Sequence, residues 1–250
     1  MRPLVFALLL APLTLQAAPD INIGAMYDYM DGQKSTLLKR VRNLGDATAF
    51  VKVSVAEIVY DQDGQSREVA VEGNGTPGIG SRSLVASPAR LIVPATGMQA
   101  LRLLYMGERD QERYFRVRFE PVLPEQNDGF GLSADESSDY RKALSAGVNV
   151  MAGYGAILLV RPADAQFRSE IKEESEHFLI TNTGNTTLIL DHFNDCAANG
   201  KQCEVPSMYH VRPGTERVFK KETGRAYRFE LIEGDKRRTV EIAGSPRQHG

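Results

Sequence analysis

The side chains that could do chemistry in this 250-residue chain are few, and their spacing matches no catalytic pattern. The sequence contains four histidines, at His177, His192, His210 and His249. None of them belongs to a nucleophile elbow or to a pair with metal-ligand spacing. A Ser-His-Asp set can be chosen on paper from so many residues, but no motif selects one. We therefore expect a protein that is not an enzyme and that uses no cofactor and no metal.

One glycine-rich stretch matches the spacing of a dinucleotide-binding motif. Gly73-Asn74-Gly75-Thr76-Pro77-Gly78 follows a predicted strand. The motif requires a helix directly afterwards, because the helix N-terminus meets the pyrophosphate. Pro77 lies inside the stretch, and residues 79–85 show no helical periodicity. The pattern therefore predicts a glycine-rich hairpin loop.

The first twenty residues, MRPLVFALLLAPLTLQAAPD, have the pattern of a secretory signal peptide. A basic residue is followed by an apolar run and then by small residues. We expect residues 1–18 to be the signal peptide, with cleavage after Ala17 or Ala18. The alternative is an N-terminal membrane anchor, for which the apolar run is short. The prediction is an exported, soluble protein.

Two cysteines, Cys196 and Cys203, lie close together in the sequence. Because exported proteins meet oxidising conditions, we predict a disulfide between them. A metal site would need further ligands, and the neighbouring His192 and His210 do not complete a known zinc spacing.

The net charge says little about function, because 30 basic and 32 acidic residues give a formal net charge of −2. The balance gives no basic face for nucleic acid.

The elements that must position these residues are almost all strands. Short β-type segments separated by turn signals are predicted at 35–43, 49–60, 67–72, 89–94, 98–106, 113–122 and 147–162. Such spacing is typical of a β-sandwich. Arg161-Pro162-Ala163-Asp164 reads as a linker, and a second set of strands follows. We expect an all-β protein with one sandwich domain over residues 19–161 and a smaller one over 164–245.

Two of these predicted strands carry side chains whose role packing within the sandwich does not explain. In 113–122, Phe115, Val117 and Phe119 alternate with a face that holds Arg116 and Arg118. That face is either a solvated surface or an anion site, since arginine binds carboxylates through two parallel hydrogen bonds.

The second feature is an apolar row at the start of the segment 147–162. Val148, Val150 and Ala152 alternate with other residues, as in a strand with one buried face. The segment before it, SADESSDYRKALSAG, is polar and charged, and we predict a loop there. The sequence alone does not say what the apolar row packs against.

Several segments together resemble the periplasmic pilus chaperones of the chaperone–usher pathway. The resemblance rests on SPARLIVPATGMQALRLL, ERYFRVRFEPV and GYGAILLVRP, in that order and spacing. The alternate, colonisation-factor branch is the most similar, through Tyr114, Arg116 and Val117 before Phe119-Glu120, and through the cysteine loop followed by Tyr209 and Pro213. The resemblance implies two immunoglobulin-like sandwich domains joined by a short linker at an angle.

The resemblance also implies partners and roles. A chaperone of this kind binds major and minor pilins, lends Val148, Val150 and Ala152 as a donor strand, and delivers the subunits to an outer-membrane usher. The better-known branch grips the subunit's terminal carboxylate with basic residues at positions that match Tyr27 and Gly155 or Ala156 here. Because none of these is basic, Arg116 becomes the leading anchor and Arg118 the second.

Two other classes of protein compete with this hypothesis. An exported adhesin or carbohydrate-binding sandwich would favour clustered aromatic residues, and tryptophan is absent. An exported hydrolase would need a catalytic constellation. We expect no nucleic acid and no small-molecule substrate as partners.

Overall fold

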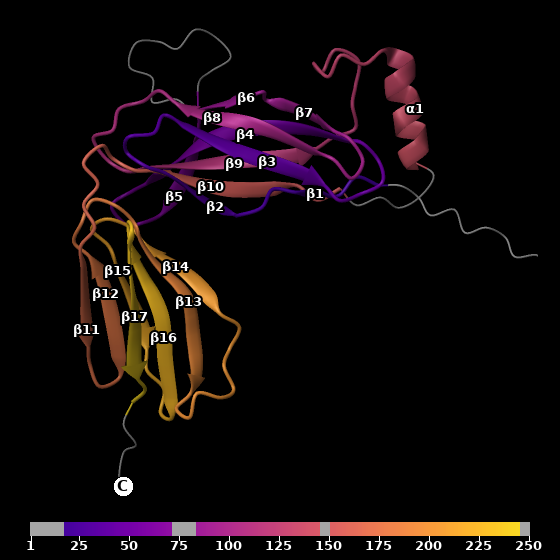
Figure 1. Ribbon diagram of the computed structural model, residues 1–250. Helices are drawn as coiled ribbons and strands as arrows, with labels where there is room; N and C mark the ends of the chain where they lie inside the picture. Colours follow the sequence, from indigo (N-terminus) through magenta and orange to yellow (C-terminus); the bar gives the residue numbers. More distant parts are fainter. Residues whose placement is uncertain (1–17, 72–83, 146–150, 246–250) are drawn as a thin grey trace, which may run out of the picture.

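The protein folds into two lobes, each made of two packed β-sheets (Figure 1). The computed structural model describes residues 18–71, 84–145 and 151–245. Most of the predicted signal peptide, the glycine-rich stretch 73–78, and Val148 and Val150 lie outside these residues. The prediction of an all-β protein is confirmed, with one helix among the described residues.

The first sheet of the N-terminal lobe has the order β1-β3-β8-β6. Its strands are β1 (Ile21–Asn22), β3 (Thr36–Asn43), β8 (Met98–Tyr105) and β6 (Leu84–Ser87). The second sheet has the order β2-β10-β9-β4-β5, and β7 also pairs with β4. Its strands are β2 (Tyr27–Met30), β10 (Tyr154–Val160), β9 (Arg113–Pro121), β4 (Ala49–Tyr60), β5 (Ser66–Ala70) and β7 (Arg90–Val93).

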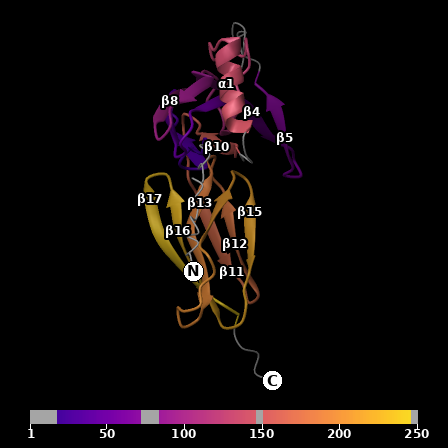
Figure 2. The same cartoon turned by 90° about the vertical axis from the view of Figure 1, so that its right-hand side faces the viewer.

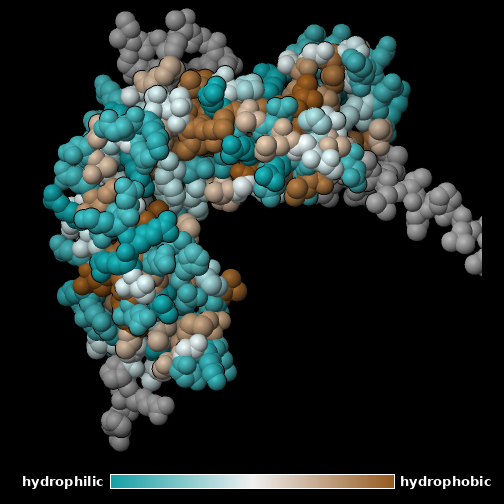
Figure 3. Space-filling view, viewed as in Figure 1, coloured by the Kyte–Doolittle hydropathy of each residue, from teal (hydrophilic) through white to brown (hydrophobic). Residues whose placement is uncertain are grey.

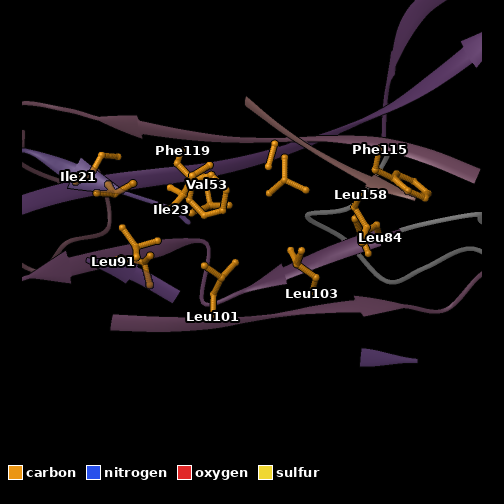
Figure 4. Packing of buried hydrophobic residues seen from close by; sticks show 14 of the residues in the cluster. Ile21, Ile23, Val53, Leu84, Leu91, Leu101, Leu103, Phe115, Phe119 and Leu158 are labelled. Carbon is orange, nitrogen blue, oxygen red and sulfur yellow. The ribbon is translucent and has the colours of Figure 1, made fainter. Parts of the chain in front are cut away.

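The core of the N-terminal lobe lies between these two sheets. Phe115, Val117 and Phe119 of β9 are buried there, as their alternation predicts. Figure 4 shows Phe115 and Phe119 facing leucines of the opposite sheet, among them Leu101 and Leu103. The burial of every second residue of β9 turns Arg116 and Arg118 to the outer face of the sheet.

The C-terminal lobe is built in the same way from seven strands of the described chain. One sheet has the order β11-β12-β15, with β11 (Ser169–Glu173), β12 (His177–Asn182) and β15 (Glu216–Lys220). The other has the order β14-β13-β16-β17, with β14 (Ser207–Val211), β13 (Leu188–Ala197), β16 (Arg225–Glu233) and β17 (Lys236–Ala243). Phe178, Phe193 and Phe229 fill the space between these sheets.

The segment predicted as a polar loop contains helix α1 (Ala134–Ser145). Ser133 caps it, because Glu136 N donates to Ser133 Oγ at 3.2 Å and the Glu136 carboxylate accepts from Ser133 N at 2.8 Å. Tyr140 and Phe130 pack edge-on against Phe50 of β4. Figure 2 shows the helix at the near end of the N-terminal lobe. No helix of the described chain is long and apolar enough to span a membrane.

Candidate functional site

The outer face of the second N-terminal sheet is the surface that holds Arg116 and Arg118. On β9, Arg116 lies opposite Ile157 of β10 and Ala56 of β4, and Arg118 lies opposite Gly155. Tyr114, two residues before Arg116, faces the same way. In Figure 3 the two lobes form the arms of an angle, with an open concave side between them.

Tyr114 marks the point where this face meets the C-terminal lobe. Its hydroxyl lies 3.3 Å from Thr187 Oγ1 and donates to the carboxylate of Glu112 at 2.7 Å. The same carboxylate accepts from Thr187 N at 3.0 Å and from the Thr187 hydroxyl. Because Glu112 and Thr187 are both buried, one carboxylate joins the two lobes through hydrogen bonds that water does not replace.

A second contact between the lobes lies beside the first. The Tyr29 hydroxyl is 2.6 Å from His210 Nε2, and the ring of Tyr27 lies 4.2 Å from that of His210. Burial lowers the pKa of His210 to about 4, with the nearby Arg217 acting in the same direction. The imidazole is therefore neutral near pH 7 and can accept the hydrogen bond from Tyr29, whose own pKa is raised by burial.

A small cavity of about 180 Å³ opens at this junction. It is lined by Tyr27, Tyr60, Tyr114, Ile157, Leu159, Thr187, His210 and Arg212. The guanidinium of Arg212 lies 3.5 Å from the centre of the Tyr60 ring. The junction is therefore aromatic, with a cation from the C-terminal lobe stacked over a tyrosine of the N-terminal lobe.

Arg116 and Arg118 form one charged cluster with Glu68 of β5. Glu68 lies 3.3 Å from Arg116 Nε and also contacts Arg118 Nη2. The side chains of all three are about one-third exposed, at 35%, 37% and 34% for Arg116, Arg118 and Glu68. The sequence indicated the two arginines by their alternation, but Glu68 gave no signal because it lies 48 residues before Arg116.

The predicted donor row is described only at Ala152, which is exposed and precedes the first residue of β10. Strand β2 pairs with β10 from Ile157 to Val160. Among the described residues, Tyr154–Ala156 therefore have a partner strand on one side only, namely β9. This short segment is an open edge of the sheet, and the chain that leads into it carries Ala152.

The structure contains the predicted disulfide between Cys196 and Cys203, at the end of β13 in the C-terminal lobe. A different group could in principle hold a metal ion, since Asp191, His192 and Glu230 bring donor atoms within 4.8 Å of one another. Asp191 pairs with the exposed His192, and Glu230 lies 3.8 Å from Arg237. Acidic groups often lie together at a surface without an ion, and we assign no metal to this group.

The chain is similar to curated fimbrial chaperones over most of its length. It is 30% identical over 222 residues to the probable fimbrial chaperone EcpB of Escherichia coli (strain SMS-3-5 / SECEC), covering 86% of this chain and 87% of that protein. The EcpB of E. coli O7:K1 (strain IAI39 / ExPEC) is 29% identical over 221 residues, with the same coverage. No family model matches the chain.

Solved structures give the same fold at low identity. The class 5 fimbriae chaperone CfaA has a TM-score of 0.52 and 17% identity, covering 91% of this chain and 100% of that one. The Salmonella enterica chaperone SafB, solved in complex with the SafA pilin, has a TM-score of 0.53 and 14% identity, covering 90% and 96%. The identity to EcpB, over most of both chains, shows that this chain belongs to the fimbrial chaperones of the chaperone–usher pathway.

Proposed function

We propose that this chain is a periplasmic, non-enzymatic chaperone that binds pilus subunits, completes their fold with a donated strand and delivers them to an outer-membrane usher. The observation that carries the proposal is the open edge of β10 at Tyr154–Ala156. The family supports it, since the similar SafB chaperone is known in complex with a pilin.

The donation step follows from the geometry of the edge. A chain that lies along Tyr154–Ala156 can form backbone hydrogen bonds there, because an edge strand offers unpaired donors and acceptors. If β10 continues toward its N-terminus on binding, Ala152, Val150 and Val148 all face the same side. These small and branched side chains suit a groove of exposed apolar core in an incomplete subunit.

The arginine cluster supplies the second part of the proposed site. Arg116 and Arg118 lie on the same face of β9 as Tyr114, which contacts the C-terminal lobe. Successive residues on one face of a strand are about 7 Å apart, so the arginines lie about 7 and 14 Å from Tyr114 along the strand. A subunit strand that ends near them would place its terminal carboxylate within reach of guanidinium donors. Arg116 remains the leading anchor and Arg118 the second.

The donor row can be tested by substitution in the full chain. Val148→Glu with Val150→Glu should abolish the recovery of soluble subunit, because two charges would enter the subunit's core without partners. The melting temperature of the free chaperone should stay within a few degrees, since the proposal places neither valine in its own core. Val218→Glu is the matched control, because Val218 is an exposed strand valine in the other lobe. A double variant that unfolds would return the valines to the chaperone's own core, and one that still binds subunit would refute donation here.

A further inference from the structure

The arginine cluster already holds a carboxylate in the free chain. Glu68 contacts Arg116 Nε and Arg118 Nη2 with its two carboxylate oxygens, one oxygen to each arginine. Of the described residues, no other acidic side chain forms an ion pair with either arginine. The cluster therefore has two cations and one anion, and the anion has the same chemistry as a chain terminus.

Glu68 reaches the arginines across an intervening strand. It lies on the edge strand β5, opposite Ile58 of β4, while Arg116 and Arg118 lie opposite Ala56 and Ser54 on the other side of β4. The small side chains of Ala56 and Ser54 leave the space over β4 through which the ion pairs form. A larger residue at position 56 would separate Glu68 from Arg116.

The ion pairs of Glu68 with the two arginines are accessible enough for another carboxylate to displace Glu68. About one-third of each of the three side chains is exposed, so water and an incoming carboxylate can reach the ion pairs. Exposed ion pairs of this kind contribute little to folding. The hydrogen bond from Arg118 is the largest of the effects that keep the pKa of Glu68 below its ordinary value, so the side chain is an anion at neutral pH.

We propose that Glu68 is a third residue of the subunit site, and that in the free chaperone its carboxylate holds the place that the subunit's terminal carboxylate takes on binding. This inference rests on the proposed function. In the exchange, one carboxylate replaces another on the same guanidinium donors, and no covalent bond changes. Glu68 keeps the two arginines oriented in the free protein. A ligand binds there only if it carries a carboxylate that can displace the carboxylate of Glu68.

The test uses the full mature chain and a labelled, N-acetylated hexapeptide of alternating valine and threonine, made with a free terminal carboxylate or with a terminal amide. Glu68→Gln should bind the carboxylate peptide about fourfold more tightly or better, which is the effect of removing one like charge about 5 Å away in water. Binding of the amide peptide should not change. Glu120→Gln is the matched control. It also removes one carboxylate from the outer face of this sheet, on β9, but Glu120 forms no ion pair with Arg116 or Arg118 among the described contacts.

The outcomes separate this inference from the proposed function. If Arg116→Ala with Arg118→Ala binds the carboxylate peptide as well as the wild type, the anchor itself is wrong. If the arginine variant loses binding but Glu68→Gln gains none, or gains no more than Glu120→Gln, only the role of Glu68 is refuted. Glu68→Asp shortens the side chain by one methylene and keeps the charge. The shorter side chain weakens the contacts with both arginines but leaves the negative charge nearby, so Glu68→Asp should gain less affinity than Glu68→Gln. A folding defect in the glutamine variant would therefore not leave the inference untested.

Discussion

Replacing Glu112 with alanine should loosen the junction between the two lobes. Glu112 is 8% exposed, and its carboxylate accepts hydrogen bonds from the Thr187 backbone, the Thr187 hydroxyl and the Tyr114 hydroxyl. Without it, the two hydroxyls can still pair, since they lie 3.3 Å apart. The Thr187 N–H has no such alternative, because the residue is 2% exposed.

The magnitude follows from this accounting of partners. A buried donor left without an acceptor costs about 1–3 kcal/mol, and lost hydrogen bonds to a charged group raise the total, while relief from burying a charge lowers it. We expect Glu112→Ala to cost about 2–3 kcal/mol. At about 2–4 °C per kcal/mol for a chain of this size, the melting temperature should fall by roughly 4–12 °C.

The isosteric variant Glu112→Gln tests how the free energy of unfolding depends on pH. Burial raises the pKa of the Glu112 carboxyl above its ordinary value of 4.5. The folded state therefore binds more protons than the unfolded state above about pH 4.5, so the free energy of unfolding falls as the pH rises through that window. Glu112→Gln should keep all three partners, because hydroxyls can accept as well as donate. It should lie within about 1 kcal/mol of the wild type at pH 7 and lack this slope.

Calorimetry measures the stability of these variants, and small-angle X-ray scattering measures the spread of the two lobes. Asp110→Ala is the control, because it removes an exposed carboxylate two residues away and should cost no more than about 1 kcal/mol. If Glu112→Ala melts and scatters like the wild type, the carboxylate does not hold the lobes together.

The anchor, the linker and the disulfide each give one further prediction. Arg116→Ala should lose subunit recovery in pull-down while the free chaperone melts normally; an unchanged yield would move the anchor to Arg118. Gly32→Ala should destabilise the protein by about 1–3 kcal/mol in denaturant unfolding, because the new Cβ would lie 2.1 Å from the Pro162 carbonyl oxygen; a wild-type midpoint would contradict that close approach. Mass spectrometry of the unreduced protein should find Cys196 and Cys203 bonded, and two free thiols would disprove it.

Much of the strand framework was predictable because a two-residue period is a local property. The segment predicted at 49–60 is β4, and the alternation of Phe115, Val117 and Phe119 gave the buried face of β9 correctly. The disulfide was also predictable, from two cysteines in a chain with a predicted signal peptide. Helix α1 was missed because its composition is polar, although Ser133 and Glu136 form a capping box that signals a helix start.

The contacts that shape the candidate site were not predictable, because they depend on how distant strands align. Tyr29 and His210 are 181 residues apart, and Glu112 and Thr187 are 75 apart. No periodicity links either pair. Glu68 is a similar case, since its contact with the two arginines depends on the register of β5 on β4 and of β4 on β9. Pattern indicates which face a residue occupies, but only pairing shows what it contacts.

The parallel pairing of β2 with β10 has a consequence for how the lobe forms after export. Asp31, directly after β2, and Arg161, directly after β10, are 130 residues apart and form an ion pair at 2.8 Å. The segment 21–30 also binds the other sheet through β1 and β3. If the chain crosses a membrane N-terminus first, as the predicted signal peptide implies, its first strands emerge long before β10, and this sandwich closes only when β10 arrives. Because pairing between distant segments is slow, we expect this closure to be a slow step of folding, and before it β2 lacks the strand that it pairs with in the described sheet.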